Sequence, residues 1–193
     1  GLGLSACGLF DIREARPPDD GPQVCQGESP TSSDIVVENF ALAMDCREDG
    51  SGLFAQTLAD GFILKLDPTD AFDLEPLGVT RDTINRAETI LAQERIVNSA
   101  EFPDSFLFVF TPVVPQDQGG SQVYYENMPY RLGIYQQDGD STWLAAEYSG
   151  TVDLTVSEEQ AGTWAISRWV DHGFGSPGST LGYLYALKAL TPG

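Results

Sequence analysis

The fold is decided by the stretch Thr163-Trp164-Ala165-Ile166-Ser167-Arg168-Trp169-Val170-Asp171. Its β-branched and aromatic residues predict a strand. Before it, Thr142 to Val156 predicts another long strand, and Glu158 to Gly162 is the expected turn between the two. Asp138-Gly139-Asp140 precedes this pair and is a strong hairpin signal. The carboxyl-terminal half of the chain therefore predicts consecutive antiparallel strands.

Further extended segments lie on either side of this core. Val123 to Gln136 predicts a strand interrupted at Met128-Pro129, where proline implies an edge position or a bulge. Ser105 to Thr111 is almost continuously apolar, which predicts a strand buried on both faces. After the glycine-rich loop at residues 173–178, Leu181 to Leu190 predicts a last extended segment.

The amino-terminal half has the spacing of helices. Ser33 is the expected N-cap of a helix that runs through Arg47, and Leu53 to Leu58 predicts a second, short helix. Phe62 to Leu66 predicts a strand that Asp67-Pro68-Thr69-Asp70 ends. Thr80 is the expected cap of a third helix, whose narrow apolar stripe comprises Ile84, Ala87 and Leu91. Helices followed by strands predict an α+β fold, with amino-terminal helices packed on a curved, mainly antiparallel sheet.

A family resemblance rests on the spacing Trp164-x-Ile166-x-Arg168-Trp169-x-Asp171, followed by Gly182-Tyr183-Leu184 and Lys188. Together with the order of helices and strands over residues 33–190, this pattern resembles the nuclear-transport-factor-2-like (SnoaL-like) superfamily, and bacterial lipoproteins within it. The resemblance implies a cone-like fold with a pocket between the helices and the concave sheet. Proteins of that fold include both enzymes and passive binders, so the fold alone does not decide the function.

The amino terminus predicts a lipid attachment site. Leu4-Ser5-Ala6-Cys7 matches the end of a bacterial lipoprotein signal, and Cys7-Gly8-Leu9-Phe10-Asp11 adds to the lipoprotein resemblance. Only six residues precede the cysteine, so we expect the chain to be truncated at its start. The alternative is an ordinary amino-terminal tail with a free thiol. The predicted organisation is a signal remnant with a lipid-site cysteine at 1–7, a flexible Pro/Gly/acidic spacer at 8–32 and a nuclear-transport-factor-2-like domain at 33–193.

The chain is strongly acidic. It has 29 Asp and Glu against 10 Lys and Arg, a formal net charge of −19. Such a charge repels nucleic acid and anionic lipid headgroups, so we expect no nucleic-acid partner. Two interpretations stay open: an acidic surface suited to a saline habitat, or a field that attracts cations and basic partners.

Two further cysteines leave the pairing question open. Cys25 and Cys46 form an even pair, and a disulfide between them would close a loop and stabilise the fold by roughly 3 kcal/mol. The alternative is that Cys46 is a small buried helix residue and Cys25 a free thiol of the spacer.

The sequence offers little catalytic or metal-binding chemistry. It has one histidine, His172, and no Gly-x-Ser-x-Gly elbow, and a His/Cys metal site lacks ligands. Asp67-x-x-Asp70 and Asp70-x-x-Asp73 could hold calcium in an extracellular loop, but their spacing lacks the full calcium-loop pattern. We therefore expect no cofactor, no metal and no catalytic residues.

Residue types alone predict a pocket lined by Tyr124, Tyr148, Trp164, Arg168 and Asp171. A pocket enzyme of isomerase, cyclase or hydratase type would need such a carboxylate and phenols, with Tyr135 as a further candidate. The favoured hypothesis is a non-enzymatic module that binds a small ligand or a protein partner, anchored to a membrane of the bacterial cell envelope (outer membrane or periplasmic face) through lipid on Cys7. The alternatives are the pocket enzyme and an accessory subunit of an envelope assembly.

Overall fold

A computed structural model describes residues 25–102, 105–139, 141–176 and 178–191. Its helices are α1 (Ser33–Asp45), α2 (Ser51–Thr57), α3 (Pro68–Leu74), α4 (Arg86–Val97) and α5 (Leu181–Leu190), with 3-10 turns η1 (Arg47–Gly50) and η2 (Glu75–Leu77). Its strands are β1 (Leu58–Lys65), β2 (Thr83–Asn85), β3 (Ser105–Phe110), β4 (Gln116–Asp117), β5 (Gln122–Asp138), β6 (Ser141–Gln160) and β7 (Thr163–His172). Among these helices, none is long and apolar enough to cross a membrane.

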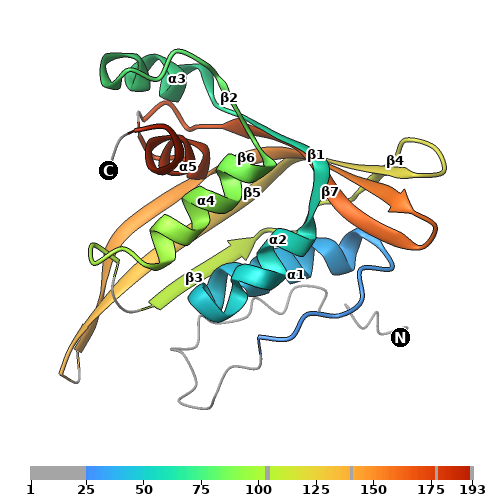
Figure 1. Ribbon diagram of the computed structural model, residues 1–193, viewed down its shortest axis with the longest axis horizontal. Coiled ribbons are helices and arrows are strands. Elements are labelled where there is room, and N and C mark those ends of the chain that lie inside the picture. Colours follow the sequence, from blue (N-terminus) through green and yellow to red (C-terminus); the bar gives the residue numbers. More distant parts are fainter. Residues whose placement is uncertain (1–24, 103–104, 140, 177, 192–193) are drawn as a thin grey trace, which may run out of the picture.

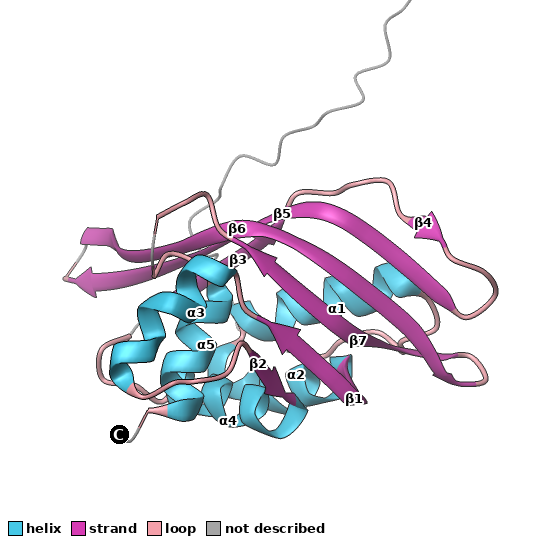
Figure 2. Ribbon diagram, turned by 90° about the horizontal axis from the view of Figure 1, so that it is seen from above, coloured by secondary structure: helices cyan, strands magenta, loops and turns pink. Residues whose placement is uncertain are grey.

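The strands form one curled sheet in the order β2-β1-β7-β6-β5-β3, with β4 paired to β5 (Figure 1). All pairings are antiparallel except that of β1 with β7, which is parallel. The helices lie on one face of the sheet, and no described element covers the other face (Figure 2). The predicted α+β class, with helices packed on a curved and mainly antiparallel sheet, is confirmed. We call the helix-covered face the inner face and the opposite face the outer face.

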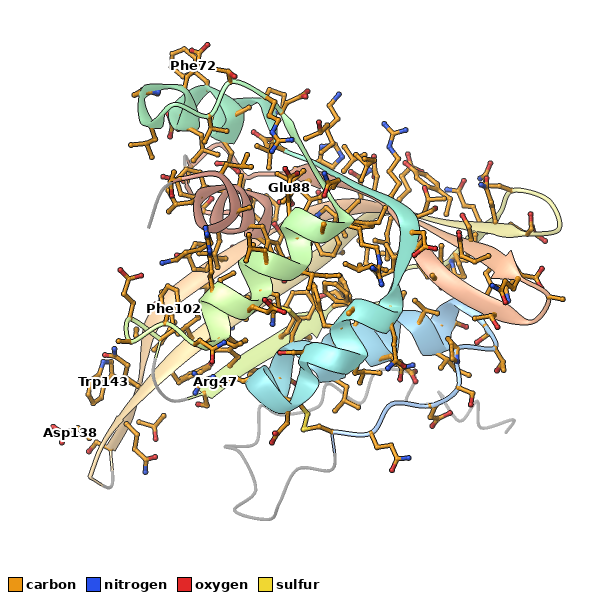
Figure 3. All side chains as sticks on the ribbon, viewed as in Figure 1. Arg47, Phe72, Glu88, Phe102, Asp138 and Trp143 are labelled. Carbon is orange, nitrogen blue, oxygen red and sulfur yellow. A yellow bond between two sulfur atoms is a disulfide. The ribbon has the colours of Figure 1, made fainter. Side chains whose placement is uncertain are left out.

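The long hairpin of β5 and β6 follows the local sequence signals. The register shifts between Tyr125 and Met128, so Met128-Pro129 lies beside a bulge as predicted. Asn127 occupies the left-handed region in this bulge, with φ 48°, a conformation that asparagine tolerates better than most residues. Trp143 and Asp138 lie near the far tip of the hairpin (Figure 3).

The prediction for Leu181 to Leu190 was wrong, because this segment is helix α5. The Thr180 side chain accepts a hydrogen bond from Tyr183 N at 3.1 Å and so caps the helix. Leu181, Leu184 and Tyr185 are buried together, which is the i, i+3, i+4 spacing of a helix face. The rich content of leucine and tyrosine hid this period.

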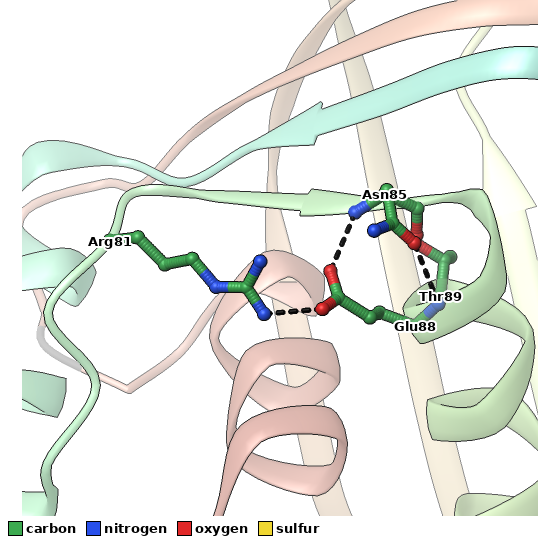
Figure 4. A network of polar contacts seen from close by, with 4 residues as sticks. All are labelled: Arg81, Asn85, Glu88 and Thr89. Carbon is green, nitrogen blue, oxygen red and sulfur yellow. Dashed lines mark hydrogen bonds and ion pairs between the residues drawn. The ribbon is translucent and has the colours of Figure 1, made fainter.

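The third predicted helix begins later than expected. Asn85, not Thr80, is the N-cap of α4: its side chain accepts from Glu88 N at 3.1 Å, and the Glu88 carboxylate accepts from Asn85 N at 2.9 Å (Figure 4). This capping box satisfies two backbone donors at once. Arg81 forms an ion pair with the same Glu88. Ile84, assigned to the helix stripe, instead lies buried in β2.

Three smaller details also differ from prediction: the cap of α1, the segment after β1 and the burial of β3. Ser32, one residue before Ser33, caps α1 and accepts from Ile35 N at 3.4 Å. Asp67-Pro68-Thr69-Asp70 does end β1, but it does so by starting α3, with Asp67 as the N-cap. Strand β3 is at a sheet edge and is buried on one face only, since Phe106 and Phe108 are buried whereas Val109 is 46% exposed.

Residues 25–32, part of the predicted spacer, are tied to the domain. A disulfide joins Cys25 to Cys46, with their Cα atoms 5.8 Å apart. The Asn39 side chain bonds both Glu28 N, at 2.9 Å, and Glu28 O, at 2.7 Å, and Trp164 N donates to Pro30 O at 2.8 Å. Besides the helix cap at Ser32, one disulfide and three hydrogen bonds therefore hold this segment to the domain. Cys7 lies outside the described residues.

Candidate functional site

Aromatic side chains fill the interior of the cone. The Phe40 ring of α1 lies 5.2 Å from the ring of Phe54 and 5.5 Å from those of Phe108 and Trp169, measured between centroids. Tyr185 of α5 adds a further ring 6.1 Å from Phe54. Trp169 and Tyr185 are each only 1% exposed. In the described part, the protein's own side chains thus occupy the space where the resemblance implies a pocket.

Asp171 lies at the inner end of this cluster and is fully buried. Its Oδ1 accepts from the Tyr130 hydroxyl at 2.6 Å, and its Oδ2 accepts from Gly182 N at 2.6 Å. The Tyr130 hydroxyl in turn accepts from Leu181 N at 2.9 Å. A Cβ at Gly182 would meet Asp171 Oδ2 at 2.5 Å, so the close approach of α5 requires glycine there. This pair of side chains therefore fixes the first turn of α5.

The loop before α5 is fixed by two more carboxylates. Asp70, 1% exposed, accepts from Gly178 N at 2.9 Å and from the Thr180 hydroxyl. Asp67 accepts from Gly173 N at 3.0 Å and from Thr69 N at 2.8 Å. The two aspartates proposed as a weak calcium pattern thus bond backbone and hydroxyl donors. Within the described residues, no group of three His, Cys, Asp or Glu is placed to hold a metal ion.

Burial dominates the electrostatics of the interior. It raises the pKa of Asp171 to about 6, although the Tyr130 hydroxyl and Gly182 N–H favour the charged form and so limit the rise. Burial also raises the pKa of Asp45 to about 6, against the opposing effect of its bond from Phe108 N. It raises the pKa of Tyr130 well above its usual value, and the nearby Asp171 carboxylate adds to this rise. The Tyr130 hydroxyl therefore stays neutral and donates its hydrogen bond to Asp171.

A shallow hollow of about 290 Å³ lies on the outer face of the sheet. Its lining comes from three neighbouring strands: Tyr124 of β5, Asp153 and Thr155 of β6, and Arg168 and Val170 of β7. The register explains the grouping, because Tyr124 pairs with Thr155 and Thr155 with Arg168 in one row across the sheet. Side chains of such a row stand on the same face.

Asp153 is the best-bonded residue of this outer hollow. It accepts from Asn127 N at 2.9 Å, pairs with His172 Nε2 at 3.1 Å and bonds the Tyr124 hydroxyl. Burial would raise the pKa of Asp153, but these three partners outweigh it and lower the pKa. Partial burial and then the bond to Asp153 raise the pKa of Tyr124. The left-handed Asn127 of the β5 bulge is what turns its N–H toward the carboxylate.

The structure places the five predicted pocket residues in three separate regions: the outer face, the inner face and the start of β7. Tyr124 and Arg168 meet in the outer hollow. Asp171 is on the inner face, as is the half-buried Tyr148, which pairs with the buried Leu132. Trp164 lies at the start of β7, against the segment that carries Pro30. The five residues therefore do not line one cavity.

Three participants of the outer hollow or its edge were not placed there from the sequence. Asn127 and His172 complete the bonding of Asp153, and Lys65 of β1 pairs with Val170 of the hollow. Alternation along β7 could have separated outward Arg168 from inward Trp169 and Asp171. Strands β1 and β7 are about a hundred residues apart in the chain, so no local sequence signal predicts that they pair.

A second hollow, of about 390 Å³, lies beside the tied segment 25–32. Besides residues 25–30, it is lined by Asn39, Gly52, Leu53, Gln56 and Thr57. The Asn39 side chain that reaches it is already bonded to the Glu28 backbone. This hollow therefore lies where segment 25–32 packs against α1 and α2, and we do not assign it a ligand.

The sequence matches no protein-family model, and no curated protein matches it. Solved structures are similar in fold. A protein of unknown function from Mycobacterium tuberculosis aligns with TM-score 0.52 at 9% identity, over 81% of this chain and 85% of its own. A protein from Kribbella flavida aligns with TM-score 0.51 at 14% identity, over 78% and 91%. A candidate scytalone dehydratase from Novosphingobium aromaticivorans aligns with TM-score 0.50 at 9% identity, over 74% and 91%.

These alignments, with the topology above, give the chain the nuclear-transport-factor-2-like cone fold. Identities of 9 to 14% concern the fold and not the activity. Within this fold, the described residues have an interior filled by aromatic rings and covered by helix α5, together with a polar hollow on the outer face.

Proposed function

We propose that this chain is a non-enzymatic binding module of the bacterial cell envelope, held at a membrane through lipid on Cys7. One observation carries the non-enzymatic part: aromatic side chains occupy the interior of the cone in the described residues. A ligand or partner then binds outside the cone. A binding module needs no catalytic group, and the outer hollow offers polar side chains to a ligand.

The alternative, a pocket enzyme of isomerase or hydratase type, has one observation in its favour. Asp171 faces the Tyr130 hydroxyl, as a base and a phenol donor would, and a candidate scytalone dehydratase shares the fold. However, both Asp171 oxygens are bonded, and one of those bonds comes from the α5 backbone. With Asp171 at 0% and Tyr130 at 3% exposure, a substrate has no described route to them. We therefore assign this pair a structural role.

The other alternative, a subunit of an envelope assembly, calls for a large apolar patch. The exposed large apolar side chains instead lie on separate elements: Ile63 on β1, Phe72 on α3, Leu77 on η2, Leu91 on α4, Val109 on β3, Val114 before β4, Trp143 and Leu144 on β6, and Phe174 after β7. Single exposed apolar residues are normal on a surface, so these side chains do not by themselves favour an assembly interface.

The proposed envelope location draws support from the disulfide. Disulfides persist in oxidising compartments such as the periplasm and are rare where thiols are kept reduced. The bond between Cys25 and Cys46 uses both cysteines of the described part and leaves Cys7 as the third cysteine of the chain. A lipid on Cys7 would be followed by residues 8–24 and then by the tied segment.

The anchor is tested by metabolic labelling. The protein is expressed in a bacterial host with a complete signal peptide and an alkyne analogue of palmitate, beside Cys7→Ala and a Cys25→Ser/Cys46→Ser control. We expect label and membrane recovery in the wild type and in the control, and loss of both in Cys7→Ala. Equal labelling of Cys7→Ala would reject the anchor.

A further inference from the structure

Two basic side chains on the outer face have no bonded partner. The side chains of Lys65 and Arg168 make no hydrogen bond or ion pair within the described residues. Every other arginine and lysine described there is engaged: Arg81, Arg131 and Lys188 pair with Glu88, Glu147 and Glu101, while Arg47, Arg86 and Arg95 bond backbone carbonyls. No described carboxylate pairs with these two cations, so they are available to an anionic ligand even though the chain has a net charge of −19.

Lys65 and Arg168 are neighbours on this face. In the parallel pairing of β1 with β7, Ile63 lies opposite Arg168 and Lys65 opposite Val170. The two cations are therefore diagonal neighbours on adjacent strands, and both point away from the helices, since Leu64 and Trp169 between them are buried on the inner face. Arg168 is exposed and Lys65 is half-buried.

The hollow itself, which Arg168 lines and Lys65 borders, adds an apolar wall and one carboxylate, Asp153, whose lowered pKa keeps it charged. Val170 and the half-buried Tyr124 line it, and Ile63, 40% exposed, stands beside Arg168. Asp153 is the one carboxylate of the lining, and its two oxygens already bond Asn127 N and His172. A volume of about 290 Å³ lies at the lower end of the range for small-molecule sites and is too small for a folded domain.

The geometry points to a binding site for a small organic anion, in which Arg168 and Lys65 hold a carboxylate or phosphate group while Tyr124, Val170 and Ile63 contact its apolar body. Arginine offers a planar donor pair that matches either anion, and lysine adds a second positive charge. This inference deepens the proposed binding role and rests on it. The net negative charge does not prevent binding, because charges beyond about 8 Å are largely screened at physiological ionic strength.

The test is a titration followed by ¹H–¹⁵N NMR at fixed ionic strength, with benzoate and phenyl phosphate as anionic probes and benzyl alcohol as a neutral one. We expect saturable shifts of the Tyr124, Arg168 and Val170 amides with at least one anion and weak, unsaturable shifts with benzyl alcohol. Arg168→Met and Lys65→Met should each weaken binding about tenfold or more, since a bond between charged groups contributes about 1.5 to 3 kcal/mol.

Arg131→Met is the matched control. Arg131 is another exposed arginine of the same sheet, and it is already paired with Glu147 at 2.6 Å, so its loss changes the net charge equally and should leave binding unchanged. Equal weakening by Arg131→Met, equal response to benzyl alcohol, or no saturable response to either anion would overturn the inference. If Cys7 still carries lipid and Trp169 is still shielded in a protein that binds no anion, the inference fails alone and the proposed function stands.

Discussion

Replacement of Asp171 by alanine should lower the free energy of unfolding by about 2 to 6 kcal/mol, because each of two buried donors left unpaired costs about 1 to 3 kcal/mol. Those donors are the Tyr130 hydroxyl and Gly182 N–H, both bonded to the carboxylate at 2.6 Å. Urea unfolding, with the denaturant slope compared between variants, measures the loss. The matched control is Asp60→Ala, an exposed aspartate of β1, which should change stability by no more than about 0.5 kcal/mol.

The same carboxyl group predicts a pH effect with a definite sign. Burial raises the pKa of Asp171 from 3.8 to about 6, so the native protein keeps a proton that the unfolded chain releases. The stabilisation from this proton is full below about pH 4 and is lost as the pH rises through 6. Asp171→Asn, which resembles the protonated acid, should flatten the fall in unfolding free energy between pH 4 and pH 7. Asp45, raised in the same way, should preserve part of that fall. An unchanged slope in Asp171→Asn would contradict the assignment.

The second large effect concerns the disulfide. Cys25→Ser/Cys46→Ser should unfold about 3 kcal/mol more easily than the wild type, because the bond closes a loop between residues 21 positions apart and so restricts the unfolded chain. Urea unfolding without and with a reductant measures the difference. A reductant should destabilise the wild type to the level of the variant and leave the variant unchanged.

Asn39→Ala separates the covalent tie from the hydrogen bonds of the same segment. It removes both bonds to Glu28 and leaves the disulfide in place, so it should cost about 1 to 2 kcal/mol. Equal stability of the wild type with and without reductant would contradict the disulfide prediction above, because it would show that the bond between Cys25 and Cys46 does not stabilise the fold.

Local signals in the sequence predicted most of the order of elements, but not α3, β2, β4 or the helical state of α5. The glycine of Asp138-Gly139, with φ 58°, and Met128-Pro129 beside the bulge predicted where the long hairpin turns and where it bends. Segment Leu181 to Leu190 was misassigned because leucine and tyrosine suit strands as well as helices, and its helical state depends on Thr180 and on burial against α4 and the core.

The candidate site was less predictable than the fold. Residue types identified Tyr124 and Arg168 but grouped them with Asp171, which alternation along β7 places on the opposite face. The filled interior depends on Tyr185 meeting Phe54, and the cation pair depends on β1 lying beside β7. Both are contacts between distant parts of the chain, and local patterns in a single sequence do not predict such contacts.

The central claim is that the interior of the cone is closed, so that ligands bind outside it. Acrylamide quenching of Trp169 fluorescence tests this most directly, in a Trp143→Phe/Trp164→Phe variant where Trp169 is the one remaining tryptophan. With Trp169 1% exposed, we expect almost no quenching in the native protein and strong quenching after unfolding in urea. Native Trp169 that is quenched as readily as in the unfolded chain would show an open interior and contradict the account.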